Sequence, residues 1–194
     1  MEDSAADGDR IHNLSDLISL QTANGLPPVE KWNPPHCGDI GMAIASNGEW
    51  LYRGSPIQRK PLVKLFSRIL RRDPDGAYYL VTPAEKIIVD VADAPFLAVE
   101  MQVEGQGDRQ QLIFRTNVDD IVHCGPAHPL RFSEHPENGG LKPYIRVRGN
   151  LDALLTRAVS YDLITLAVSL YEDGADQDND DLAINSGGAN FKLI

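Results

Sequence analysis

The spacing of hydrophobic residues predicts several elements in the first part of the chain. Apolar residues recur at helical spacing over residues 13–22, which predicts an amphipathic helix. The proline-rich residues 25–38 cannot continue this helix and are expected to form an extended connector. Two short apolar runs, 42–46 and 49–53, flank Asn47-Gly48, a dipeptide typical of a two-residue hairpin turn. The order predicted so far is helix, connector and β-hairpin.

Residues 59–72 carry a second helical pattern, with Pro61 in its first turn and the turn sequence 73–76 at its end. Beyond it, short β-branched or alternating runs are separated by glycine and proline, which is typical of strands. The predicted strands are residues 78–82, 86–91, 96–104, 110–116, 121–123, 130–133 and 144–148. The second half of the chain is therefore expected to be mostly antiparallel sheet.

Residues 151–171 predict a closing helix, with Asn150 as its N-cap. Because residues 158–170 are apolar on nearly every side, we expect this helix to be covered on two sides. Residues 172–190 lose aromatic and branched side chains and are typical of a mobile tail. The chain is therefore expected to be α+β, with two tandem related domains. The predicted regions are an N-terminal tail and helix (1–25), an N-terminal α+β domain (26–85), a C-terminal domain (86–171) and an acidic tail (172–194).

The two halves share an order of elements and some local sequence. A hairpin followed by a helix is predicted in residues 42–72 and again in 130–170, and Arg-Gly-[Ser/Asn] ends the second strand in both. A duplicated unit would place Arg53 and Arg148 at equivalent positions on two halves that pack about a pseudo-symmetric groove. A three-residue match also arises by coincidence in a chain of this length.

The composition, 42% hydrophobic and 24% charged over 194 residues, is that of a globular protein with one ordinary domain or two small ones. No apolar run approaches the roughly 18 residues of a transmembrane helix, and the acidic first residues do not resemble a signal peptide. Cys37 and Cys124 are too few for a disulfide framework, which agrees with a reducing compartment. We therefore expect a soluble, cytoplasmic protein without a membrane partner.

The net charge of −10 is concentrated at the two ends of the chain. Residues 1–9 hold four acids and residues 172–181 hold six, which leaves 18 acids against 17 bases in residues 10–171. Within that span, residues 50–72 hold seven bases and no acid, and residues 131–157 hold five bases and three acids. Two such positive regions suit a compact anion better than a nucleic-acid polymer, which needs a continuous basic surface.

Motifs for catalysis and metal binding are weak. His36-Cys37 and His123-Cys124 suggest zinc ligands, but adjacent residues in extended chain point to opposite sides, so no metal site is expected. Ser55 and His128 lack the context of a nucleophile elbow. The absence of a dinucleotide fingerprint after a strand and of a Walker A motif excludes conventional nucleotide sites, though not an irregular pocket. The sequence favours a non-catalytic protein without a cofactor.

Several motifs resemble one family. They include the runs 32–39 (WNPPHCGD), 80–86 (LVTPAEK) and 116–120 (TNVDD), with shorter matches at 47–50, 54–57 and 128–130. These runs resemble the uncharacterised bacterial family called domain of unknown function 1285 (DUF1285), over about residues 26–170. The resemblance implies two tandem, structurally related α+β domains, the second loosely like a pleckstrin-homology fold. It also implies a nucleotide-type ligand site at the domain interface and a role in signalling.

The positions of arginine favour anion binding, because three of them lie on the polar faces of predicted strands and a guanidinium binds phosphate or carboxylate with two parallel hydrogen bonds. A threonine, a lysine and an asparagine add donors near loop ends. The candidate ligand-binding residues are Arg53, Thr82, Lys86, Asn117, Arg146 and Arg148. The alternative is that the arginines form salt bridges between the domains with Asp119, Asp120 or Asp162.

Two functions from different classes follow from these observations. The first is a non-catalytic sensor that binds a nucleotide-like anionic small molecule between its halves, with a role in signal transduction. The second is a scaffold whose pleckstrin-homology-like half docks a protein partner, with the basic segment 59–72 as a contact face. A ligand held by the folded state raises the melting temperature, so a thermal-shift screen of nucleotides separates the two.

Overall fold

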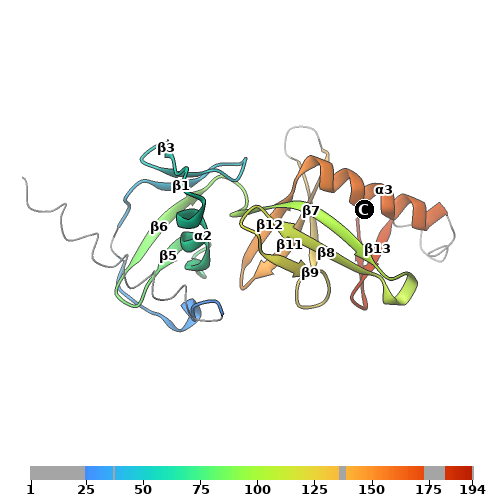
Figure 1. Ribbon diagram of the computed structural model, residues 1–194, viewed down its shortest axis with the longest axis horizontal. Helices are drawn as coiled ribbons and strands as arrows, with labels where there is room; N and C mark the ends of the chain where they lie inside the picture. The colour runs from blue at the N-terminus through green and yellow to red at the C-terminus, as the bar shows by residue number, and fades with distance from the viewer. Residues whose placement is uncertain (1–24, 37, 136–138, 173–181, 194) are drawn as a thin grey trace, which may run out of the picture.

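The computed structural model describes residues 25–36, 38–135, 139–172 and 182–193, and it shows two β-rich domains that follow one another along the chain (Figure 1). The first domain consists of η1 (Val29–Lys31), β1 (Met42–Ile44), β2 (Trp50–Tyr52), β3 (Ser55–Pro56), α2 (Lys60–Arg68), β4 (Leu70–Arg72), β5 (Tyr78–Val81) and β6 (Lys86–Val91). The second consists of β7 (Phe96–Glu104), η2 (Gly107–Arg109), β8 (Gln111–Thr116), β9 (Ile121–His123), β10 (Leu130–Glu134), β11 (Leu141–Arg148), β12 (Leu151–Leu155), α3 (Arg157–Glu172), β13 (Ala183–Ser186) and β14 (Ala189–Lys192). The predicted helix 13–22 lies outside the described residues.

Each domain contains a six-stranded sheet, and the two sheets have the same strand order. The first runs β3-β2-β1-β6-β5-β4 and the second runs β9-β8-β7-β12-β11-β10. In both, two antiparallel meanders of three strands are joined at the centre by one parallel pair, β1 with β6 and β7 with β12. The chain is thus α+β, with mixed sheets and two tandem domains.

The predicted correspondence between residues 42–72 and 130–170 is wrong. Arg53 follows β2, the second strand of the first meander in its sheet, whereas Arg148 ends β11, the second strand of the second meander, so the two arginines occupy non-equivalent places. The shared Arg-Gly-[Ser/Asn] sequence reflects similar turns, because Gly54 and Gly149 both have a positive φ, of 77° and 48°. Strand order matches β2 with β8 and β5 with β11 instead.

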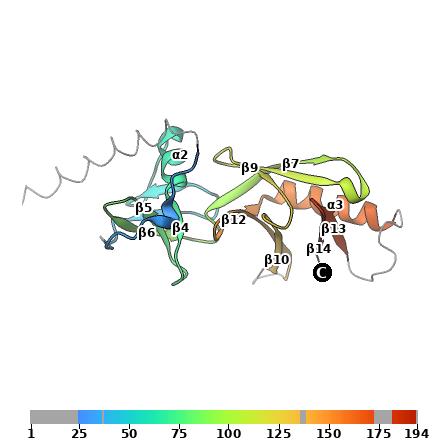
Figure 2. The ribbon, with the colours of Figure 1, turned by 90° about the horizontal axis from the view of Figure 1, so that it is seen from below.

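Helix α2 covers one face of the first sheet (Figures 1 and 2). Its Phe66 ring stacks on Trp50 of β2 at a centroid distance of 6.1 Å, and Leu65 is buried beside them in the hydrophobic core. The predicted helix 59–72 is too long, because the helix ends at Arg68 and the next residues form β4. Pairing of β4 with β5 provides the backbone hydrogen bonds of these residues, and Leu70 is buried.

The predicted helix 151–171 begins six residues later than expected, at Arg157. Its first part is strand β12, whose residues alternate between buried and half-buried positions in the middle of the second sheet. In α3 itself the buried residues form one stripe, Val159, Leu163 and Ala167. The expectation that α3 is covered on two sides is therefore wrong, and Tyr161 is 71% exposed.

Residues 183–192, predicted to be part of a mobile acidic tail, form the β13–β14 hairpin instead, so this prediction is wrong there. Residues 173–181 of the predicted tail lie outside the described part of the chain. The hairpin contacts α3 and η2. Ser186 secures it, because its hydroxyl donates to the carbonyl oxygen of Cys124 at 2.8 Å and accepts from the amide of Leu112 at 2.8 Å. Burial raises the pKa of the neighbouring Cys124 thiol to about 11.

Strand β6, which the sequence assigned to the second domain, completes the first sheet. The boundary between the sheets therefore falls after Val91 and not at residues 85–86. A short link, residues 92–95, leads into β7. None of the helices in the described part of the chain is long and apolar enough to span a membrane.

Candidate functional site

The three candidate residues of the first domain do not converge. Arg53 lies in the turn after β2, at a φ of 49°, with its guanidinium 5.2 Å from the ring centre of Tyr52. The Thr82 hydroxyl accepts hydrogen bonds from the amides of residues 84 and 85 and so closes the turn between β5 and β6. Lys86 binds the Asp73 carboxylate, with 2.7 Å between Nζ and Oδ2. These contacts are structural roles within the first domain.

Asp73 is the centre of a charged cluster that holds the N-terminal connector. Arg71 binds its carboxylate at 2.5 Å and also donates to the carbonyl oxygens of Val29 and Trp32 at 2.7 Å each. Burial opposes the charge on Asp73, but the hydrogen bonds from Arg71 and Lys86 outweigh it and hold the pKa of this carboxyl below its usual value. The connector 25–36 is thus tied to the first sheet by charge-assisted hydrogen bonds.

Two candidate residues of the second domain hold the two domains together. The Asn117 amide donates to the carbonyl oxygen of Gly48 in the β1–β2 turn, at 3.4 Å. Arg148 donates through Nη1 to Asp120 at 2.6 Å and through Nη2 to the carbonyl oxygen of Ser67 at 2.6 Å, near the end of α2. A Cβ added at Gly48 would lie 2.8 Å from the Asn117 amide nitrogen, so a larger residue there would displace the Asn117 side chain from this contact.

Arg146 pairs inside the second domain, with Asp152 at 2.5 Å, and also donates to the carbonyl oxygen of Gly149. The six candidates are therefore spread over turns and over the domain junction. The alternative was that the arginines form salt bridges between the domains with aspartate partners. Arg148 does pair with Asp120, but both residues belong to the second domain, and its contact with the first domain is the hydrogen bond to the Ser67 carbonyl oxygen. Asp119, another of those partners, pairs with Lys64 of α2 at 2.5 Å across the junction.

An open cleft of about 850 Å³ lies between the domains, on a part of the junction that none of the six candidates lines. Ser46 contributes from the first domain and Asp93 from the link. The second domain contributes residues of β11 and β12 and the first turn of α3, including Lys142 and Arg157. The volume of the cleft is within the range of about 300–1,000 Å³ typical of small-molecule sites.

The basic groups of this cleft differ in how they are engaged. Lys142 Nζ lies 2.6 Å from Asp93, whose other carboxylate oxygen accepts a 2.8 Å hydrogen bond from the Tyr144 hydroxyl. The hydrogen bond to Asp93 raises the pKa of Lys142, so this lysine stays charged but is neutralised locally. Arg157 is exposed and has no hydrogen bond or ion pair with any described residue. It is therefore the cation that a bound anion can engage without displacing a partner.

The start of α3 adds to the positive potential of the cleft. Arg157 and Ser160 both line it, so the first turn of this 16-residue helix borders the open space. The first amides of a helix lack intrahelical acceptors and carry the positive end of the helix dipole. These groups favour a negatively charged ligand over a neutral or cationic one.

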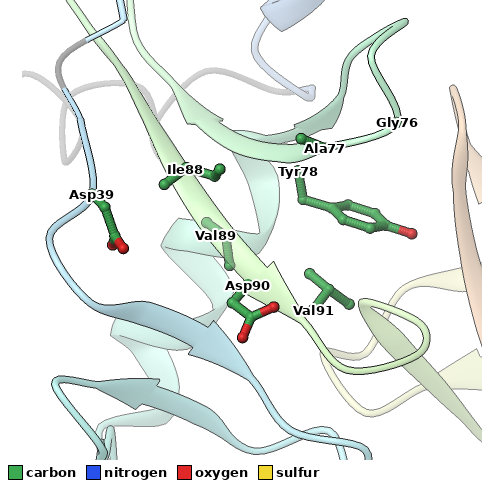
Figure 3. A pocket seen from close by; sticks show the side chains of 8 residues that line it. All are labelled: Asp39, Gly76, Ala77, Tyr78, Ile88, Val89, Asp90 and Val91. Atoms are coloured by element: carbon green, nitrogen blue, oxygen red, sulfur yellow. The ribbon is translucent and has the colours of Figure 1, made fainter.

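A second pocket, of about 450 Å³, lies on the first domain (Figure 3). It is lined by Asp39, by Tyr78 of β5 and by residues of β6 that include Asp90. Figure 3 shows two carboxylates and no basic side chain among the labelled residues. Repulsion between these carboxylates and an anion makes this pocket unsuitable for the ligand that the sequence predicts.

Metal chemistry finds no support in the arrangement of side chains. In the described ranges, no group of three or more histidine, cysteine, aspartate or glutamate side chains is placed to hold a metal ion. His123 is exposed and Cys124 is buried, so these neighbours point to opposite sides, and Cys37 lies outside the described residues. At residues 123–124 the structure thus has the geometry for which the sequence argued, with the two side chains on opposite sides of the chain.

The cleft takes its basic side chains from a segment that the sequence singled out, but not from the candidate residues named there. Lys142 and Arg157 both belong to the base-rich segment 131–157, whereas the candidates chosen there were Arg146 and Arg148. The signal that distinguishes them is the acid available to each arginine. Arg146 and Arg148 find Asp152 and Asp120 through tertiary contacts, which leaves Arg157 unengaged among the described residues.

The fold and cleft define a two-domain α+β protein with an open, basic junction between mixed sheets. The model of the DUF1285 N-terminal domain, described as a domain of unknown function, matches residues 27–94, and that of the DUF1285 C-terminal domain, described as a protein of unknown function, matches residues 95–193. This chain belongs to the DUF1285 family, as the sequence motifs predicted.

Two crystal structures of DUF1285 family proteins are similar to this chain. The protein from Silicibacter pomeroyi DSS-3 is 41% identical over 92% of this chain and 94% of that chain, with a TM-score of 0.79. The protein from Shewanella baltica OS155 is 26% identical over 64% of this chain and 91% of that chain, with a TM-score of 0.51. A search of curated proteins gives no match to this chain.

Proposed function

We propose that this protein binds a small, phosphate-bearing anion of nucleotide size in the cleft between its domains. The observation that carries the proposal is the cleft of about 850 Å³ with Arg157 free to bind at its edge. The first turn of α3 lies on the same cleft and adds the positive end of the helix dipole. The proposed function is binding without catalysis.

The proposal includes a role in signal transduction, which the position of this cleft between the domains supports. A ligand that contacts Ser46 of the first domain and Arg157 of the second prefers one relative position of the two domains. Binding then shifts the population of domain arrangements by the difference in affinity between them. The contacts of Asn117 with Gly48, Arg148 with Ser67 and Asp119 with Lys64 are among those between the domains that such a shift would change.

Two finer features of the fold are part of the proposal. An origin of the two domains by duplication is supported by their common strand order. The likeness of the second domain to a pleckstrin-homology fold is supported by the helix α3 that follows the last strand of its sheet, together with the sequence resemblance. The scaffold function with the basic segment 59–72 as docking face is less well supported, because Lys64 pairs with Asp119 and Arg71 is buried.

The test is a thermal-shift and calorimetric screen of the full chain with inorganic phosphate, pyrophosphate, mono- and dinucleotides and cyclic dinucleotides. At a ligand concentration about 100 times Kd, stability rises by about 2.7 kcal/mol, which raises the melting temperature by about 5–10 °C for a chain of this size. Arg157→Ala is expected to weaken binding by about tenfold or more, since a hydrogen bond to a charged group contributes at least about 1.4 kcal/mol.

Arg109→Ala is the matched control, because Arg109 is also exposed and lies in η2, in the loop between β7 and β8. The control should bind like the wild type, and both variants should keep the wild-type melting temperature without ligand. If no anion shifts the melting temperature at millimolar concentration, or if both variants lose affinity equally, the proposed function is wrong.

A further inference from the structure

Helix α3 presents an apolar face to solvent. Tyr161, Val168 and Tyr171 are 71%, 39% and 42% exposed, outside the buried stripe of Val159, Leu163 and Ala167. Together with Ile164 they are spaced by three, four and three residues, which places them in one row along the helix. In Figure 1 this helix forms the upper edge of the second domain. An apolar row of this kind on an exposed helix is typical of an interaction surface.

The charges on α3 argue against a membrane and for a protein surface. A helix that lies on a membrane carries several lysines or arginines beside its apolar face. The charged residues of α3 are one base, Arg157, and two acids, Asp162 and Glu172. The helix thus has the apolar row of a membrane-surface helix without its positive charge.

The spacing of residues along α3 is self-complementary. The midpoint between Tyr161 and Val168 is also the midpoint between Arg157 and Glu172, between residues 164 and 165. In an antiparallel pair centred there, Tyr161 meets Val168 of the partner subunit, and Arg157 meets Glu172 of the partner subunit. Each contact occurs twice, as a two-fold symmetric interface requires. Opposed helix dipoles also favour the antiparallel orientation.

We propose that α3 is a dimerisation surface whose partner is a second copy of this chain, packed antiparallel through Tyr161, Ile164, Val168 and Tyr171. The dimer needs no anion, but it shares Arg157 with the proposed ligand cleft, so its test is made without added anions. Contact through one helix of 16 residues gives an interface at the small end of the specific range, below about 1,200 Å². The dimer is therefore expected to be reversible, with a micromolar dissociation constant.

Sedimentation velocity of the full chain, without added anions, tests the proposal over about 1–200 µM, the range in which a weak interface dissociates. The wild type should shift with concentration from the 21.3 kDa monomer toward twice that mass. Tyr161→Glu and Val168→Asp should each weaken the dimer at least tenfold. Ile121→Glu is the matched control, because Ile121 is 58% exposed on β9, and it should dimerise like the wild type.

Charge reversal tests the register of the pair. Glu172→Arg places two arginines together at each end of the interface and should weaken the dimer about two- to fivefold, the range of an exposed ion pair. Arg157→Glu combined with Glu172→Arg exchanges the partners and should restore wild-type affinity. Circular dichroism checks that each variant is folded. A monomeric wild type, a dimer insensitive to Tyr161→Glu, or a double variant no better than Glu172→Arg overturns the proposal.

Discussion

Arg148→Ala is expected to loosen the junction between the two domains. The Arg148 side chain is only 18% exposed and connects Asp120 of the second domain to the Ser67 carbonyl oxygen, near the end of α2, at 2.6 Å each. A cation at the end of a helix is favoured by the helix dipole. Alanine removes both hydrogen bonds and leaves Asp120 without its cation. The substitution therefore acts on the contact between domains and not on the proposed anion cleft.

The magnitude follows from the two hydrogen bonds. A hydrogen bond to a charged group contributes about 1.5–3 kcal/mol. Water reaches the Asp120 side chain, which is 31% exposed, and compensates part of its loss. We therefore use the lower end of the range, about 1.5 kcal/mol for each of the two hydrogen bonds. Arg148→Ala is then expected to reduce the free energy of unfolding by about 3 kcal/mol. For a chain of this size the melting temperature falls by about 6–12 °C.

The positions of the two tryptophans provide the assay. Trp32 and Trp50 are the tryptophans of the sequence and both lie in the first domain, so their fluorescence reports on that domain, whereas far-UV circular dichroism reports on both. If Arg148 couples the domains, the two unfolding midpoints should separate in Arg148→Ala. Arg146→Ala is the control, because its pair with Asp152 lies within the second domain. A melting temperature within about 1 °C of the wild type, or an equal effect of Arg146→Ala, would refute the reasoning.

Three further predictions concern the first domain, the C-terminal hairpin and the buried thiol. Because the folded pKa of Asp73 is below its usual value, this carboxylate stabilises the fold above about pH 3.9, and the contribution is lost as pH falls through the folded pKa. Urea unfolding of Asp73→Asn should therefore show a smaller loss of stability between pH 5 and pH 2 than the wild type, and an equal loss would contradict this. Ser186→Ala should cost about 1–2 kcal/mol and speed amide exchange in residues 183–192; unchanged exchange would mean that the hydroxyl does not secure the hairpin. Cys124, with a pKa of about 11 and a buried side chain, should resist iodoacetamide at neutral pH until denaturant is added, as measured by peptide mass spectrometry. Rapid labelling of the native protein would show that the thiol is accessible.

Local chemistry explains the elements that the sequence predicted well. The hairpin around Asn47-Gly48 is confirmed, because a tight turn depends on the turn residues themselves and on the two runs beside them. The start of α2 is confirmed for the same reason, with a proline in its first turn. Membership of the DUF1285 family and two tandem α+β domains were also correct, because they rest on motifs spread along most of the chain.

The errors occur where a distant partner decides the conformation. Residues 70–72 and 151–155 fit the helical pattern of their neighbours, but they become β4 and β12 because β5 and β7 offer backbone partners. Residues 183–192 look like a polar tail in the sequence, and the docking site that Cys124 and Leu112 provide for Ser186 turns them into a hairpin. Spacing along the chain carries no information about such partners.

For the candidate site, the sequence by itself determined that positive charge gathers in two segments, and that the second of them is residues 131–157. Only the tertiary structure decided which of those bases is free. Arg146 and Arg148 have acids within hydrogen-bond distance, while Arg157 stands at the edge of a cleft without a described partner. Charge is a property of each residue, but its availability depends on which opposite charges the fold brings within a few ångströms, because the energy of an ion pair falls with distance and with exposure to water.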